Sequence, residues 1–67
     1  MELLVNNKPE ILLAGSSLAD LMLQLSLLEK RGIAVAVNGV VVPKAGWQGF
    51  ALNGQDKITL IRPTQGG

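Results

Sequence analysis

Cysteine, histidine and tyrosine are all missing from this 67-residue sequence. Their absence removes the thiol nucleophile, the imidazole base, the phenolic acid and the soft metal ligands on which many enzyme and metal sites depend. The remaining side chains make the chain a poor candidate for an autonomous catalyst, and we expect no catalytic residues and no metal site.

Aromatic residues, charge of one sign and long apolar runs are also scarce. Trp47 and Phe50 are the only aromatic residues, so the core must be built from Leu, Ile and Val. Six basic and five acidic residues are scattered along the chain and leave a net charge of +1, which provides no basic stripe for nucleic acid and no polybasic patch for a membrane. No apolar run approaches the length of about 18 residues that spans a bilayer, and the first residues lack the basic start of a signal peptide. We therefore expect one small cytoplasmic domain that binds neither nucleic acid nor membrane.

The first 14 residues show the pattern of a β-hairpin. Apolar residues recur at every second position, at Met1, Leu3 and Val5, which is the period of a strand with one buried face. Turn-forming residues follow at 6–9, and residues 10–14 form a second apolar run. The pattern predicts two antiparallel strands.

A helix is predicted to begin at Leu18. Ser17 and Asp20 have the spacing of a capping box, in which each side chain accepts a hydrogen bond from the other residue's backbone amide. Cations and a glycine at residues 29–32 are typical of a helix end.

Apolar residues at helical spacing follow this start and predict one buried helix face. The residues of this stripe are Leu18, Leu21, Met22, Leu25 and Leu28. A leucine stripe also suits a partner-binding helix, but in so small a protein the core is the better interpretation. Leu23 and Leu27 lie off the stripe.

A second hairpin is predicted in the middle of the chain. Residues 33–37 alternate β-branched residues with alanine, and residues 40–42 are three valines. Between them lies Asn38-Gly39, the strongest short signal for a two-residue hairpin turn.

The segment 44–52 shows neither the two-residue period of a strand nor the 3.6-residue period of a helix. It is interpreted as irregular or as a single helical turn. Its two aromatic residues, Trp47 and Phe50, are expected to cover one edge of the core; a binding role for Trp47 is the less favoured alternative. Residues 53–56 then predict a turn, and residues 57–62 predict a last strand, which Pro63 ends because proline cannot donate to a ladder.

The resulting order is two strands, a helix, two strands, an irregular turn and a final strand, which is the order of the β-grasp (ubiquitin-like) fold. We therefore expect an α+β domain with a mixed sheet of about five strands and one crossing helix. Because one helix covers one face of the sheet only, the other face is left for a partner. The candidates for this interface are Leu4, Ile61 and either Ile11 or Leu13, with Leu13 preferred.

The last four residues, Thr64, Gln65, Gly66 and Gly67, form a candidate functional tail. Glycine has no Cβ and tolerates most backbone angles, so a Gly-Gly end can pass through a narrow channel and present its carboxylate to a catalytic site. We predict a β-grasp domain at residues 1–63 and a flexible tail at residues 64–67. The alternative is an inert, frayed terminus.

At this point the whole sequence resembles the ThiS/MoaD-type family of ubiquitin-like sulfur carriers, and within it the carriers of thiamine biosynthesis. The most discriminating feature is the spacing of Val37-Asn38, Val42-Pro43-Lys44 and Trp47. The residues that open the helix at 14–18, the segment 56–58 and the terminal Gly66-Gly67 agree with it.

The resemblance implies a function for the tail. A free α-carboxylate is ionised at neutral pH and is a poor electrophile, so it must be activated from outside. In the family, a ThiF-like adenylating enzyme uses ATP to adenylate the terminal glycine, here Gly67. A persulfide sulfur donor then converts it to a thiocarboxylate, and a ThiG-like thiazole synthase takes the sulfur. The resemblance thus implies a protein co-substrate without a bound cofactor, since ATP and the sulfur donor are used by the partners.

Two other functions remain open at the level of the sequence. The small subunit of molybdopterin synthase shares the fold and the Gly-Gly end, although it is usually longer and richer in aromatic residues. A ubiquitin-like modifier joined to target lysines through Gly67, or an interaction module with an inert tail, is the third possibility.

Overall fold

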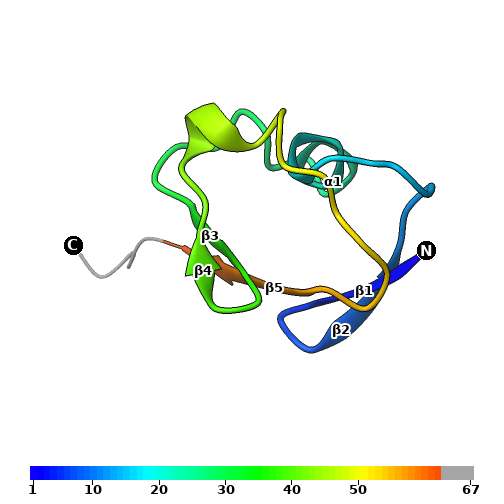
Figure 1. The fold of residues 1–67 in the computed structure, drawn as a ribbon. Helices are drawn as coiled ribbons and strands as arrows, with labels where there is room; N and C mark the ends of the chain where they lie inside the picture. Colours follow the sequence, from blue (N-terminus) through cyan, green and yellow to red (C-terminus); the bar gives the residue numbers. More distant parts are fainter. Residues whose placement is uncertain (63–67) are drawn as a thin grey trace.

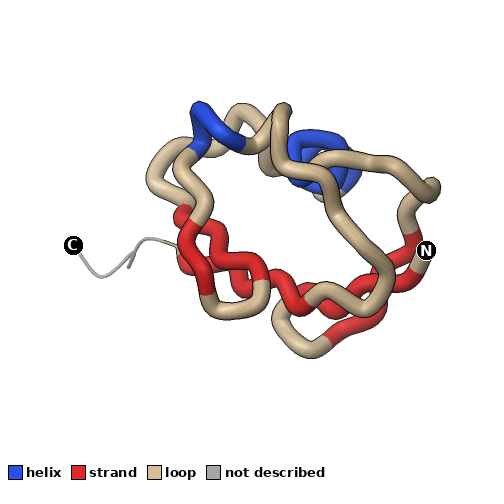
Figure 2. The backbone as a smooth tube through the Cα atoms, in the orientation of Figure 1, coloured by secondary structure: helices blue, strands red, loops and turns tan. Residues whose placement is uncertain are grey.

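The computed structural model describes residues 1–62 and contains the predicted order of elements (Figure 1). These elements are β1 (Glu2–Val5), β2 (Lys8–Ile11), α1 (Leu18–Gln24), β3 (Ala34–Val37), β4 (Val40–Val41), the 3-10 helix η1 (Lys44–Gly46) and β5 (Lys57–Ile61). Loops rather than regular elements make the connections from α1 to β3 and from η1 to β5 (Figure 2).

The strands form one five-stranded mixed sheet in the order β2-β1-β5-β3-β4. The first and last strands pair in parallel at its centre, and the other pairs are antiparallel. Helix α1 and η1 both lie on one side of the sheet (Figure 1). The β-grasp prediction is confirmed: within residues 1–62, no helix covers the opposite face.

The turn of the first hairpin is shorter than the sequence predicts, so the second strand begins two residues earlier, at Lys8 instead of residue 10. Asn6 and Asn7 have φ values of 49° and 69°, as a two-residue type I′ turn requires, and asparagine tolerates this conformation well. Lys8 and Pro9 therefore already belong to β2, and the predicted strand at residues 10–14 is wrong in its bounds. Proline is tolerated there because β2 is an edge strand.

The second hairpin forms as predicted. Asn38 and Gly39 have φ values of 51° and 85°, so both occupy the left-handed region, and Val37 pairs with Val40 across the turn. The strand after the turn is short, because β4 contains only Val40 and Val41.

The helix begins with the predicted capping box. The Ser17 hydroxyl accepts from the Asp20 amide at 3.1 Å, and the Asp20 carboxylate accepts from the Ser17 amide at 2.8 Å. Leu18 is the first helical residue. Two of the amides that a helix start leaves without partners are thereby satisfied.

The helix ends well before the glycine stop that the sequence predicts. Ser26 takes a left-handed conformation with φ of 61°, and its amide donates to Leu23 O at 3.0 Å. The Leu27 amide donates to Met22 O at 2.8 Å, which completes a Schellman motif. Leaving the helix lets Leu27, which lies off the predicted stripe, bury all but 6% of its surface in the core.

The core lies between α1 and the sheet. Leu18, Leu21 and Met22 of the helix are fully buried, so the first half of the predicted stripe is confirmed, whereas Leu25 and Leu28 only pack partly against the core. The sheet contributes the alternating residues Leu3, Val5, Val35, Val37, Ile58 and Leu60. Among the helices of the described residues, none is long and apolar enough to cross a membrane.

Candidate functional site

The open face of the sheet is a candidate interaction surface. Along β5, Ile58 and Leu60 are buried toward the helix, while Lys57, Thr59 and Ile61 point to the opposite side. The registers of the neighbouring strands extend this face across the sheet. Its apolar members are Leu4 on β1, Pro9 and Ile11 on β2, Ala34 and Ala36 on β3, Val41 on β4 and Ile61 on β5.

One end of this face is apolar and adjoins the point where β5 ends. Ile61 pairs with Ala34, and Ala36 pairs with Val41 on the next strand. The Ile61 and Val41 side chains are 51% and 62% exposed. We call Ala34, Val41 and Ile61 the tail-root patch, because the chain continues from Ile61 toward the terminal glycines. An exposed apolar patch of this kind is typical of a protein-binding surface.

The three residues predicted for the interface occupy different places. Ile61 lies in the tail-root patch, and Leu4 is half-buried on the same face, between Pro9 and Lys57. Leu13 is 84% exposed but follows the end of β2, so it does not belong to the sheet face. Ile11, the alternative to Leu13, is the residue that lies on the face, at 65% exposure.

Sequence reasoning missed Val41, although a signal for it was present. A two-residue turn at Asn38-Gly39 fixes Val37 opposite Val40, which places Val41 opposite Ala36. Because Val37 points into the core, Ala36 and its partner must point to the open face. The hairpin signal was therefore sufficient to place Val41 on the open face of the sheet.

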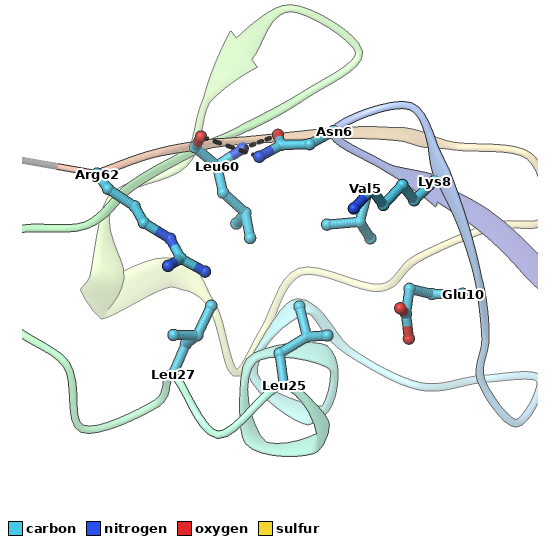
Figure 3. A pocket seen from close by; sticks show the side chains of 8 residues that line it. All are labelled: Val5, Asn6, Lys8, Glu10, Leu25, Leu27, Leu60 and Arg62. Atoms are coloured by element: carbon cyan, nitrogen blue, oxygen red, sulfur yellow. Dashed lines mark hydrogen bonds between the residues drawn. The ribbon is translucent and has the colours of Figure 1, made fainter.

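A cleft of about 240 Å³ lies on the opposite, helix-bearing side of the sheet. Figure 3 shows Arg62 pointing into it from the end of β5, above Leu25 and Leu27 at the end of the helix. The other lining residues are Val5, Asn6, Lys8, Glu10 and Leu60. The Asn6 side chain has a structural role, because its oxygen accepts a hydrogen bond from the Leu60 amide at 2.8 Å. The aliphatic floor and mixed-charge rim contain a single carboxylate and no nucleophile suited to catalysis.

Within residues 1–62, no group of three or more His, Cys, Asp or Glu side chains could hold a metal ion. The predicted sulfur-carrying residue Gly67 and the tail residues Thr64, Gln65 and Gly66 lie outside the described residues.

The comparisons with known proteins agree with the fold and with the sequence pattern. The family model described as the ThiS family matches residues 2–67. This chain belongs to the ThiS family. A search of curated proteins found no match.

Two solved structures share the fold of this ThiS-family chain. The crystal structure of a thiamine biosynthesis protein (ThiS) from Geobacter metallireducens superposes with a TM-score of 0.83 at 22% identity, over 100% of both chains. An NMR solution structure of a thiamine biosynthesis protein from the same organism gives a TM-score of 0.78 at 22% identity, over 100% of this chain and 88% of the other. Family membership supports a sulfur carrier of thiamine biosynthesis, and small carriers of the ThiS type are generally not enzymes themselves.

The residues that carry the ThiS resemblance stabilise the fold. The Asn38 side chain accepts from the Lys57 amide at 3.0 Å and donates to the Asp56 carboxylate at 3.0 Å, which fastens the second hairpin to the start of β5. Trp47 donates from Nε1 to Val42 O at 2.9 Å inside the core. The residues that carry the resemblance therefore stabilise the described domain.

Proposed function

We propose that this ThiS-family chain carries sulfur as a thiocarboxylate on Gly67 and delivers it to a thiazole synthase. The observation that carries the proposal is the family match, which extends through Gly66 and Gly67. The absence of cysteine supports it, because the carrier then needs another atom to hold sulfur, and a terminal carboxylate can become one.

The proposed reaction requires partner enzymes at every step. A carboxylate oxygen of Gly67 attacks the α-phosphate of ATP on a ThiF-like enzyme, and pyrophosphate leaves. The terminal sulfur of a cysteine persulfide then attacks the acyl adenylate, and AMP leaves. A second thiol reduces the resulting acyl disulfide to the thiocarboxylate, which a ThiG-like thiazole synthase uses as its sulfur source. The chain binds no cofactor of its own in this scheme.

The position of the tail-root patch supports docking to such partners. A partner surface that covers Val41 and Ile61 lies next to the last described residues of β5. Residues 64–67 span at most about 14 Å when fully extended. A partner bound at the patch can therefore receive the Gly67 carboxylate in a cleft close to its docking surface.

The proposal predicts that the Gly-Gly end is essential for sulfur loading and dispensable for folding. Deletion of Gly67, or Gly66→Val, should abolish thiocarboxylate formation, because a β-branched side chain restricts φ and ψ and widens the chain where a channel must admit it. Each variant is incubated with an adenylating enzyme, ATP and a persulfide donor, and the intact protein is weighed by mass spectrometry. Thr64→Val is the control, since it places a valine in the tail before the glycines, at a position that already holds a β-branched residue.

The mass of the product and the enzyme that accepts its sulfur together distinguish the possible functions. Exchange of one oxygen for sulfur on the parent and on the Thr64→Val control, but not on the Gly67 deletion, supports the carrier. A covalent conjugate of higher mass would support a ubiquitin-like modifier instead. Delivery of sulfur to a pterin-forming synthase, but not to a thiazole synthase, would support the molybdopterin-type carrier. Equal sulfur loading of the Gly67 deletion would contradict the proposed role of the tip.

A further inference from the structure

Strand β2 is an exposed edge of the sheet, and its outward-facing backbone groups follow from the register. Leu12 and Met1 exchange backbone hydrogen bonds, so the residue pairs of the hairpin alternate between bonded and non-bonded from this point. Leu4 and Pro9 form a non-bonded pair, as do Glu2 and Ile11. The backbone groups of Pro9 and Ile11 therefore point away from the sheet, toward any additional strand.

Two of these four outward positions are closed. Pro9 has no amide hydrogen and cannot donate. The Ile11 carbonyl already accepts a hydrogen bond from Nε2 of Gln24, in the last turn of α1, at 3.0 Å. The amide of Gln24 thus lies where the donor of an incoming strand would have to bind. The Pro9 carbonyl and the Ile11 amide are the two groups that remain.

The two closures act on different registers of pairing with a second copy of this chain. An antiparallel copy that places Ile11 opposite Pro9 loses a hydrogen bond because of the proline, and it sets the two Glu10 carboxylates opposite each other. A copy that places Ile11 opposite Ile11 avoids the proline, but it needs the Ile11 carbonyl that Gln24 covers. Together the two residues oppose both registers.

Without these closures, β2 would be prone to self-association. Ile11 and, just beyond the strand, Leu13 expose 65% and 84% of their surfaces. A free edge flanked by exposed apolar residues is a template for pairing between copies. At the other edge of the sheet, pairing with a second copy is limited by the length of the strand. Strand β4 has only two residues, and Pro43 follows shortly after it.

We propose that Pro9 and Gln24 close the β2 edge against pairing with a second copy of this chain and so keep it monomeric. Gln24 acts here as a cap of the strand edge, reaching from the helix to the strand. The proposal is independent of the sulfur chemistry. It implies that partners bind the faces of the sheet and the tail and do not add a strand at β2.

The test compares the parent with Gln24→Met, Pro9→Val and the double variant. Methionine keeps the length of glutamine and removes its donor. Gln48→Met is the matched control, because Gln48 is exposed and its side chain makes no hydrogen bond with the described residues. Sedimentation velocity over a concentration series measures association, and NMR hydrogen exchange measures protection of the Ile11 amide.

We expect the parent and Gln48→Met to remain monomeric, and the double variant to dimerise as its concentration rises. In the dimer, exchange of the Ile11 amide should slow by at least about tenfold, since that amide gains an acceptor only by edge pairing. A folded double variant that stays monomeric overturns the proposal, and so does a dimer in which the Ile11 amide is not protected. If the double variant does not fold, the same two measurements on Gln24→Met alone decide, because that position is exposed at the helix end.

Discussion

Trp47 shows how a single residue closes the core of a protein with few aromatic side chains. Its ring is buried, and its Nε1 donates to the Val42 carbonyl at 2.9 Å. The Lys44 ammonium lies 6.0 Å from the ring centroid, at the outer limit of a cation–π contact. The predicted role as a cover of the core is confirmed, and the alternative role in binding is not needed to explain this residue.

We predict that Trp47→Phe lowers the free energy of unfolding by about 2 to 4 kcal/mol, because it leaves a cavity and removes the donor to a buried carbonyl. Urea denaturation followed by circular dichroism measures the change. Phe50→Leu is the control, since Phe50 is only half-buried and should cost less. Equal stability of parent and Trp47→Phe would contradict this role of the indole.

Ser26 is a second residue whose effect depends on its backbone conformation. Its φ of 61° lies in the left-handed region, which costs a residue with a Cβ about 1 kcal/mol or more. We predict that Ser26→Gly raises the free energy of unfolding by about 0.5 to 1 kcal/mol, because glycine is the favoured residue at this position of a Schellman motif. In a urea titration, Ser16→Gly should instead be neutral or destabilising, since Ser16 does not have a positive φ. A loss of stability in Ser26→Gly would contradict the proposed end of the helix.

At the scale of the element, α1 is too short to be stable by itself. A helix of seven residues is marginal in water, so it depends on the capping box, the Schellman motif and the burial of its apolar face. The three fully buried residues in its first turns pack on the sheet, whereas Leu25 and Leu28 lie at the margin of the core. The contribution of each stripe residue to the free energy of unfolding should therefore decrease from Leu18 toward Leu28.

We predict that Leu21→Ala lowers the free energy of unfolding by about 2 to 5 kcal/mol, and that Leu25→Ala costs roughly half as much. The reason is that Leu21 is fully enclosed, so its truncation leaves a cavity, while solvent can fill part of the space left by Leu25. Chemical denaturation of both variants gives the ratio. Equal losses would show that the second half of the stripe is packed more tightly than its exposure indicates.

At the scale of the whole molecule, the core lies on one side of the sheet and the candidate docking surface on the other. One face of the sheet packs against α1 (Figure 1). The other face presents the tail-root patch. Substitutions on the open face should therefore change binding to a partner without unfolding the chain.

We predict that Ile61→Asp weakens binding to a ThiF-like enzyme by tenfold or more, about 1.4 kcal/mol, because the carboxylate must be desolvated without a counter-charge when the complex forms. Leu4→Asp should act in the same direction, with some loss of stability because Leu4 is half-buried. The control is Leu23→Asp, at an apolar residue of α1 that is 63% exposed and outside the open face. Isothermal titration with the enzyme measures the affinities, and equal affinity of Ile61→Asp and Leu23→Asp would exclude the tail-root patch as the docking surface.

The sequence by itself determined the features that depend on near neighbours. The turn at Asn38-Gly39, the capping box at Ser17 and Asp20 and the alternation of Ile58 and Leu60 could all be predicted, because each rests on residues within a few positions of one another. The resemblance to the sulfur carriers also came from the sequence, through spacings that the structure explains as fold-stabilising contacts.

The tertiary structure decided what depends on contacts between distant segments. The helix ends at Gln24, and the left-handed conformation of Ser26 then turns the chain so that Leu27 is buried in the core. Val41 and Ile61 come together across β3 only because β5 pairs with β3, and no local pattern specifies that pairing. The same holds for Gln24 and Ile11, which are 13 residues apart in the chain and meet because α1 packs across the sheet. Such contacts become favourable only when the whole core forms, since the cost of closing each loop is recovered by burial elsewhere in the fold.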